Sequence, residues 1–296
     1  MKEGDYLYYS PLRYPGGKGK LAPFMKLILE QLGLTGGIYI EPFAGGAGIA
    51  LDLLFNEIVS EIVINDLDKG IYSFWRAITT ETDRFIDKIY STPINIEEWR
   101  RQRNIVINES SRYSFELGFA TFYLNRTNRS GIIKGGVIGG IEQNKQWKLD
   151  ARFNKDELAK RIVNIGEKKK YIHIYNKDIT SFLRNYVPKY QENAFIYFDP
   201  PYFKKGKQLY LNFFNRKDHI RIEEEIRNLI NCAWVITYDD VPEIAEIYNG
   251  YEVKRFDLRY CAASNRKASE IIIFKDSQMI PSKVLLDEMK ICINLR

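Results

Sequence analysis

The sequence predicts an α/β protein whose mainly parallel sheet is interrupted by an inserted helical region. Short apolar runs typical of buried strands alternate with helical patterns in residues 1–74 and again in 170–296. Between residues 75 and 169 this alternation lapses, and amphipathic helical patterns follow one another. A chain of 296 residues is long enough for one α/β domain that carries an insertion, or for two domains.

Composition excludes several kinds of site. The three cysteines, Cys232, Cys261 and Cys292, are isolated, so neither a disulfide framework nor a thiolate zinc site is expected. His173 and His219 are the only histidines, which argues against a multi-histidine metal centre. No stretch approaches the roughly 18 apolar residues of a membrane span, so we expect a soluble, cytoplasmic protein. From the few, isolated cysteines and histidines we also expect no metal site. The net charge of +6 suits a polyanionic partner without establishing one.

The chain begins with a basic loop. Residues 11–20 contain a Pro-Gly-Gly turn, and a helical pattern follows over residues 21–31. Such a loop can deliver backbone amides and Lys18 to an anion or a carboxylate. A solvated basic loop is the alternative interpretation of these residues.

A glycine-rich turn and a spaced acid come next. A strand over 38–40 leads into Gly45, Gly46 and Gly48, and an apolar helix continues to about residue 55. The second strand, 61–66, ends in Asp66, a position suited to binding ribose hydroxyls. Together the turn and the acid predict a nucleoside-cofactor pocket.

Glu41 bears on the identity of that cofactor. It stands directly before the glycine turn, where its charge would repel a pyrophosphate but not a sulfonium. The glycine spacing also differs from the dinucleotide fingerprint G-x-G-x-x-G. Both observations favour S-adenosylmethionine over NAD.

The inserted region contains a polar loop among its helices. Helices are expected over residues 83–90, 96–105, 114–123 and 156–165. A loop or hairpin is expected after Tyr123, and its basic and amide side chains suit base edges and phosphates. An ordinary polar hairpin is the alternative. The candidate DNA-binding residues in it are Asn125, Arg126, Asn128, Arg129 and Lys134.

Strands and helices alternate again after residue 170. Asp178, between a strand at 171–175 and a helix at 179–185, can bind the cofactor's adenine amino group or simply cap that helix. Strand 194–198 precedes Asp199. The remaining elements expected are a helix at 218–231, a strand at 233–238, a helix at 241–248, an antiparallel pair at 251–260 and 268–274, and a short helix after residue 281.

The D-P-P-Y sequence at 199–202 is the candidate catalytic site. Two prolines end the strand abruptly, which places Asp199 at the carboxyl end of a parallel strand, the edge where ligands bind in such sheets. Asp199 and the Pro200 carbonyl can each accept one N–H of an exocyclic amine, while Tyr202 stacks on the ring. This arrangement would free the nitrogen lone pair for attack on an electrophile. A capping aspartate and a Pro-Pro turn are the alternative.

Five ordered motifs resemble one enzyme family. R-Y-P-G-G-K at 13–18, E-P-F-A-G-G-A-G at 41–48, N-D at 65–66, Y-L-N-R-T-N-R-S-G at 123–131 and F-D-P-P-Y at 198–202 resemble the Dam-like (D12 class) DNA N6-adenine methyltransferases. The resemblance implies a Rossmann-like class I methyltransferase sheet. It also implies an S-adenosylmethionine-binding catalytic domain, 1–74 and 170–296, and a helical DNA target-recognition domain, 75–169.

The resemblance also implies roles for individual residues. Asp199 would touch both the cofactor and the target N6, and Tyr202 would stack on a flipped adenine. The loop after Tyr123 would read bases in the major groove, although Thr-Asn-Arg-Ser departs from the aromatic tip of the GATC readers. The implied cofactor-binding residues are Tyr14, Lys18, Glu41, Phe43, Gly45, Gly46, Gly48, Asp66, Asp178 and Asp199.

Implied partners are double-stranded DNA and, in a restriction-modification system, a cognate endonuclease for the same site. We expect a monomer or a weak dimer. The rival functions are methylation of cytosine N4, RNA adenine or a protein amide, a nicotinamide-dependent oxidoreductase, and a DNA-binding protein without activity. Cytosine N4 enzymes more often have serine in place of Asp199.

Overall fold

A single mixed sheet organises the protein. The computed structural model describes residues 9–13, 18–203, 214–257, 270–291 and 293–296. Strand order is β3-β2-β1-β4-β5-β7-β6-β8, parallel from β3 to β5 and antiparallel in the pairs β5–β7, β7–β6 and β6–β8. The strands are β1 (Ile38–Glu41), β2 (Glu61–Asn65), β3 (Ile172–Tyr175), β4 (Ala194–Phe198), β5 (Ala233–Asp239), β6 (Glu252–Asp257), β7 (Glu270–Phe274) and β8 (Asn294–Leu295).

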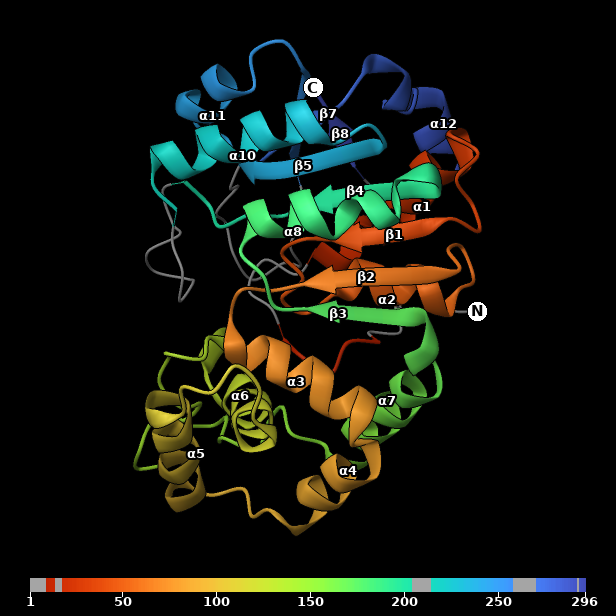
Figure 1. Ribbon diagram of the computed structural model, residues 1–296. Coiled ribbons are helices and arrows are strands. Elements are labelled where there is room, and N and C mark those ends of the chain that lie inside the picture. The colour runs from red at the N-terminus through yellow and green to blue at the C-terminus, as the bar shows by residue number, and fades with distance from the viewer. Residues whose placement is uncertain (1–8, 14–17, 204–213, 258–269, 292) are drawn as a thin grey trace.

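Helices cover both faces of this sheet, so its central strands are apolar on both sides. In β4, Phe195 and Tyr197 join the apolar core beneath α1 and α2, whereas Ile196 and Phe198 join the core beneath α8 and α10. Figure 1 shows these two layers of helices, with all the parallel strands pointing to one edge. The covering helices are α1 (Ala22–Gln31), α2 (Gly48–Phe55), α8 (Ile179–Asn185), α10 (Arg216–Leu229), α11 (Pro242–Ile247) and α12 (Lys283–Glu288).

The order of elements confirms the predicted α/β class, and small differences have local causes. Helix α10 begins at Arg216, two residues before the predicted start, because Asn215 and Asp218 form a reciprocal capping box. The antiparallel pair predicted near the C-terminus is β6 and β7, within the described part of that segment. Short 3-10 turns lie at Lys18–Leu21, Arg129–Gly131, Lys169–Tyr171, Val187–Lys189, Gln191–Asn193 and Ser277–Met279.

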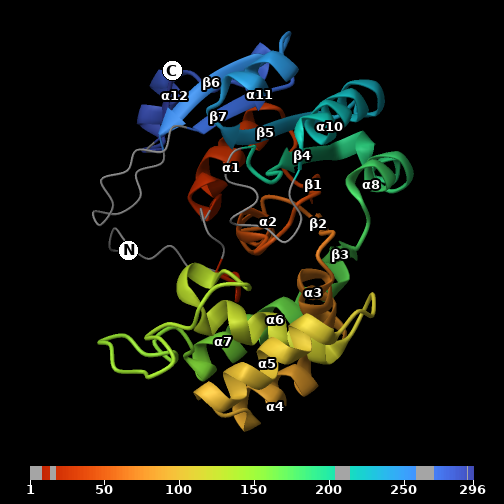
Figure 2. The ribbon, with the colours of Figure 1, turned by 90° about the vertical axis from the view of Figure 1, so that its left-hand side faces the viewer.

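The inserted region is helical, as predicted, and packs around aromatic side chains. Phe122 lies 5.4 Å between ring centroids from Phe85 and from Phe153, and 5.8 Å from Phe74. Figure 2 shows these helices below the sheet, on the side of its outer strand β3. They are α3 (Lys69–Thr80), α4 (Thr82–Ser91), α5 (Ile96–Asn108), α6 (Phe115–Thr127) and α7 (Lys155–Glu167).

Helix α3 belongs to both parts of the molecule. It runs without a break through the boundary expected after residue 74, and it contacts β3 on one side and α6 and α7 on the other. Asp68 caps it by accepting hydrogen bonds from the amides of Gly70 and Ile71. The insertion is therefore attached through a shared helix at its N-terminal end.

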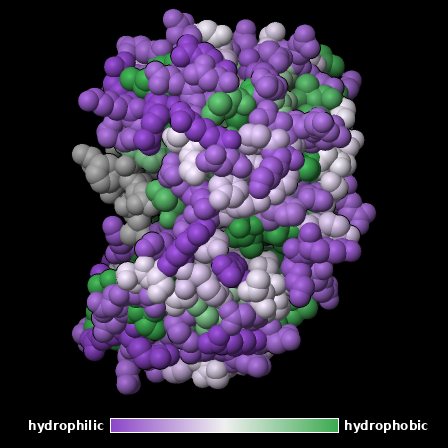
Figure 3. Space-filling view, viewed as in Figure 1, coloured by the Kyte–Doolittle hydropathy of each residue, from purple (hydrophilic) through white to green (hydrophobic). Residues whose placement is uncertain are grey.

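The loop expected after Tyr123 begins later than predicted. Helix α6 continues to Thr127, so Asn125 and Arg126 are helical residues, and the prediction of loop structure for 124–127 is wrong. An antiparallel bridge between Asn128 and Val137 then closes a compact loop. Figure 3 shows the mainly hydrophilic surface of the face seen in Figure 1.

Two kinds of feature are absent from the described part of the chain. Within the described ranges, no helix is both long enough and apolar enough to cross a membrane. No group of three or more His, Cys, Asp or Glu side chains placed to hold a metal ion occurs among those same residues.

Candidate active site

The glycine turn after β1 is held from two sides. Gly45 has φ of +45°, a left-handed conformation that favours glycine, and Ala47 is left-handed with φ of +44°. The amide of Gly45 donates to Asp66 Oδ2 at 2.9 Å, and its carbonyl accepts from Trp75 Nε1 at 2.9 Å. The turn is thus fixed by the second strand and by α3.

Asp66 stands where the sequence predicts, directly after β2. Besides Gly45, its carboxylate accepts the amide of Asp68 at 2.9 Å, and burial raises its pKa to about 7. The neighbouring Asn65 donates to the carbonyls of Pro42 and Lys177, which ties the ends of β1, β2 and β3 together. The N-D pair therefore braces the edge of the sheet.

Glu41 is a buried acid at the end of β1. Only 5% of the residue is exposed, and its Oε1 accepts the amide of Ala50 in the first turn of α2 at 3.1 Å. Burial raises the pKa of its carboxyl to about 8. A cationic ligand would reverse this effect by favouring the ionised form.

Asp199 follows β4 and is held by a chain of hydroxyls. Thr237 Oγ1 donates to Asp199 Oδ1 at 3.1 Å, and the hydroxyls of Thr237 and Tyr197 lie 2.8 Å apart. Burial raises the pKa of Asp199, and the Lys18 ammonium, 3.8 Å away, opposes that shift. Thr237, on β5, was not singled out from the sequence.

Glu270 links the basic loop to the D-P-P-Y residues. Lys18 Nζ lies 2.5 Å from its Oε2, and the Tyr202 hydroxyl donates to its Oε1 at 2.9 Å. The ammonium also lies 5.5 Å and 5.7 Å from the ring centroids of Tyr202 and Phe256. Sequence reasoning missed Glu270; the signal was an acid at the start of the apolar run E-I-I-I-F.

A cavity of about 550 Å³ joins several of these groups. Asp199 directly after β4, Glu41 from β1 and Lys18 from the basic loop all line it, together with the start of α2. Its opposite wall comes from the inserted region. Of the predicted cofactor residues, those that line the cavity are Lys18, Glu41, Phe43, Gly46, Gly48 and Asp199.

The other predicted cofactor residues lie elsewhere. Gly45 and Asp66 are outside the cavity lining; Gly45 directly precedes the lining residue Gly46, and its amide donates to Asp66. Asp178 is exposed and caps α8 by accepting the amide of Ser181 at 3.1 Å, which matches the capping alternative. Tyr14 lies outside the described residues. Pro200 is buried directly after Asp199.

Two of the predicted DNA-binding residues are buried. Asn125 is 1% exposed and bonds to the amide and carbonyl of Arg13 at 2.6 and 2.7 Å and to the carbonyl of Gly131 at 2.9 Å. Asn128 is fully buried and accepts the indole N–H of Trp99 at 2.7 Å. Because their amides are committed to the fold, their assignment to base contacts is corrected to a structural role.

The three predicted cations differ in position. Arg129 and Lys134 are exposed, and the Arg129 guanidinium lies against Gly136, where an added Cβ would come within 2.5 Å of Nη2. Arg126 instead lines the cavity, and its Nε donates to the carbonyl of Arg152 at 2.7 Å. Arg129 and Lys134 therefore remain candidates for contacts outside the cavity.

The chain is similar in sequence or in fold to several known proteins. The chain is similar to the type II methyltransferase M.MjaIII of Methanocaldococcus jannaschii, at 22% identity over 265 residues, covering 82% of this chain and 89% of that protein. Among solved structures, it resembles the rRNA methyltransferase aviRa of Streptomyces viridochromogenes at 11% identity, covering 92% and 94% of the two chains with a TM-score of 0.42. It also resembles the Escherichia coli protein yhhF, described as a putative methyltransferase, at 9% identity. That match covers 90% of this chain and 92% of the other, with a TM-score of 0.37.

These two structural likenesses carry no weight in the assignment. The family rests on a different match, in which the model of the D12 class N6 adenine-specific DNA methyltransferases covers residues 14–260. That range contains the glycine turn, the inserted helices and the D-P-P-Y sequence. The chain therefore belongs to the D12 class N6 adenine-specific DNA methyltransferase family.

Proposed function

We propose that this enzyme transfers a methyl group from S-adenosylmethionine to N6 of an adenine that is turned out of double-stranded DNA, at a specific sequence. One observation carries the proposal. Asp199, at the carboxyl end of β4, lines the same cavity as Glu41 and the glycine turn. A hydrogen-bond acceptor for an amine and a binding site for a cationic nucleoside thus share one space.

The residues of the cavity fit the proposed cofactor. Glu41 is a buried carboxyl whose pKa of about 8 leaves it easily ionised by a nearby cation. The turn at Gly45 and Gly46 lets a ligand approach the backbone closely, and Asp66 beside it offers a carboxylate for ribose hydroxyls. When bound, S-adenosylmethionine supplies its methyl group as an electrophile on a sulfonium.

The protein's own contribution is to position and polarise the amine. Asp199 and the Pro200 carbonyl accept its two N–H groups and draw the nitrogen lone pair out of conjugation with the ring. Tyr202 stacks on the base while its hydroxyl stays on Glu270. Asp199, with its raised pKa, then takes the proton that the methylated amine loses. Turning the base out costs a few kcal/mol of stacking.

The decisive experiment identifies the product. Purified protein is incubated with labelled S-adenosylmethionine and duplex DNA, and the DNA is digested to nucleosides. N6-methyl-2′-deoxyadenosine is the expected labelled nucleoside, whereas N4-methyl-2′-deoxycytidine or an absence of label would contradict the proposal. Single-stranded RNA of the same sequence separates DNA from RNA specificity.

The recognition site follows from expression in a host without adenine methylation. Sequencing that genome for modified adenines gives the methylated sequence directly. We propose that a cognate endonuclease cutting the same site is a partner, since the Methanocaldococcus relative is a type II methyltransferase. A monomer or weak dimer stays a prediction, which sedimentation would check.

A further inference from the structure

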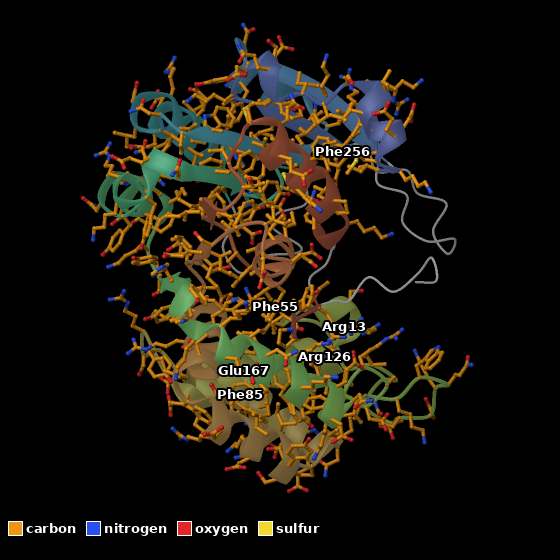
Figure 4. The ribbon with its side chains drawn as sticks, turned by 90° about the vertical axis from the view of Figure 1, so that its right-hand side faces the viewer. Arg13, Phe55, Phe85, Arg126, Glu167 and Phe256 are labelled. Atoms are coloured by element: carbon orange, nitrogen blue, oxygen red, sulfur yellow. The ribbon has the colours of Figure 1, made fainter. Side chains whose placement is uncertain are left out.

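Four arginines form one wall of the cavity, facing the sheet. They come from separate elements: Arg13 from the N-terminal segment, Arg126 from α6, Arg152 from the segment before α7, and Arg161 from α7. We call them the arginine wall. Figure 4 shows Arg13 and Arg126 close together where the inserted region meets the rest of the molecule. Glu157 is the one acid lining the cavity that comes from the inserted region, within the described ranges.

Backbone carbonyls hold three of these guanidinium groups in place. Arg13 donates to the carbonyl of Asn128 at 3.4 Å. Arg126 donates to the carbonyls of Arg152 at 2.7 Å and Pro11 at 3.4 Å. Arg161 donates to the carbonyl of Ser10 at 2.9 Å and also pairs with Glu157. The carbonyls orient the groups without neutralising them, so the wall is fixed in place and remains cationic.

Burial together with repulsion between the neighbouring guanidinium groups lowers the pKa values of two of them. Burial lowers the pKa of Arg126 to about 9, and the neighbouring guanidiniums of Arg13 and Arg161 contribute to that shift. Burial likewise lowers the pKa of Arg13, with Arg152 as the second cause. One carboxylate, Glu157, faces four guanidiniums, so an anion entering the cavity would relieve an electrostatic penalty already present.

The chemistry of the anion follows from net charge. S-adenosylmethionine carries one carboxylate, one ammonium and one sulfonium, so the wall repels it as a whole. A DNA strand carries one negative charge per nucleotide, and the planar guanidinium fork matches the oxygens of a phosphate. Ser130, which also lines the cavity, adjoins the exposed Arg129, so basic groups continue from the wall to the surface.

We propose that the arginine wall binds a backbone phosphate of the DNA strand that carries the extruded adenine. This inference rests on the proposed function and adds a site to it. Because Asp199 lines the same cavity, a phosphate held at the wall would set the distance between the strand and the acceptor that grips the amine. The wall is thus an anchor for the backbone rather than a reader of sequence.

The test measures how DNA affinity depends on salt. Arg152→Gln is the first variant, because no hydrogen bond or ion pair of its guanidinium holds the fold together within the described ranges. Arg126→Gln is the second. Lys160→Gln is the control, since Lys160 is exposed on α7 outside the cavity lining and the change removes the same charge. Each protein is titrated with one duplex between 50 and 200 mM KCl, and S-adenosylmethionine binding is measured by calorimetry.

Each lost phosphate contact lowers the slope of log affinity against log salt by about 0.9. Over this salt range the wild-type protein should therefore lose roughly 3-fold more affinity than Arg152→Gln or Arg126→Gln. Cofactor affinity and the slope of Lys160→Gln should match those of the wild type.

Three results would overturn the inference. The slope could be unchanged in both arginine variants, or it could fall equally in Lys160→Gln, which would indicate a general positive field. Alternatively, cofactor affinity could fall with the slope unchanged, which would place the cofactor's carboxylate at the wall. If only the phosphate-site inference is wrong, the wild-type protein still methylates adenine in duplex DNA. If the proposed function is wrong, the wild-type protein does not methylate adenine.

Discussion

Lys18 and Glu270 form a buried ion pair, Nζ to Oε2 2.5 Å, between residues 252 positions apart in the chain. Their side chains are 9% and 7% exposed. Removing one partner of a buried pair leaves the other charge uncompensated, at a cost of about 3–5 kcal/mol. The pair also fixes the ring of Tyr202 through its hydroxyl. It therefore couples the basic loop to the D-P-P-Y sequence.

A double-mutant cycle measures that coupling. Glu270→Gln and Lys18→Gln should each lower the free energy of unfolding by about 3 kcal/mol, and the double variant should cost clearly less than their sum. Urea unfolding checks this, with Arg255→Gln, which breaks an exposed pair with Asp240, as the control. Additive effects of the two substitutions would show that the pair is energetically unimportant.

Asp199→Ala should reduce methyl transfer by on the order of 100-fold or more, because removal of one preorganised polar group commonly costs that much. Thermal unfolding should be nearly unchanged, since among the described residues the carboxyl accepts only the hydroxyl of Thr237, apart from the ion pair with Lys18. Thr237→Val, which removes the hydroxyl and keeps the carboxylate, should cost less activity. Substantial methylation by Asp199→Ala would contradict its assigned role.

Stability without cofactor should fall as pH rises. The pKa of Glu41 is raised from 4.5 to about 8, so the folded state holds this proton more tightly than the unfolded state. Its stabilising contribution is complete below pH 4.5 and is lost as pH rises to about 8, at about 1.4 kcal/mol per pH unit. Asp66 acts in the same direction up to about pH 7. Glu41→Gln should flatten the profile measured by chemical denaturation; an identical slope in both proteins would refute the assignment.

Cofactor affinity should carry the opposite pH dependence. A sulfonium favours the ionised form of Glu41, so binding of S-adenosylmethionine should tighten as pH rises toward about 8 and release protons. S-adenosylhomocysteine lacks the sulfonium charge and should show a weaker dependence. Calorimetry in buffers of different ionisation enthalpy measures both effects. Equal pH dependence of the two ligands would mean that Glu41 does not sense the sulfonium.

Substitutions at Asn125 and Arg129 should have different effects, the first on stability and the second on DNA recognition. Asn125→Ala removes three hydrogen bonds to Arg13 and Gly131 and should lower the free energy of unfolding by about 2 kcal/mol or more. Arg129→Ala should leave stability unchanged, because the residue is exposed, and should weaken or relax DNA recognition. Thermal unfolding and binding to a set of related duplexes distinguish them. A stability loss in Arg129→Ala without any change in recognition would contradict the assignment.

Local patterns in the sequence were enough to predict most of the elements and the acids at strand ends. Glu41, Asp66 and Asp199 could be placed because a strand that stops abruptly leaves its last residue at the sheet edge. Glu270 and Thr237 could not, since they act across neighbouring strands that only the fold brings beside Lys18 and Asp199. Asn125 was misplaced for the same reason: its partner Arg13 lies 112 residues earlier.

The indole of Trp75 has a consequence for cooperativity. Trp75 lies on α3, the helix shared by both parts of the protein, and its indole N–H donates a hydrogen bond to the carbonyl of Gly45. If the proposed function holds, any tilt of that helix on binding of the duplex would move the glycine turn that we propose binds the nucleoside. The two ligands would then alter each other's affinity by one common factor, whichever arrives first.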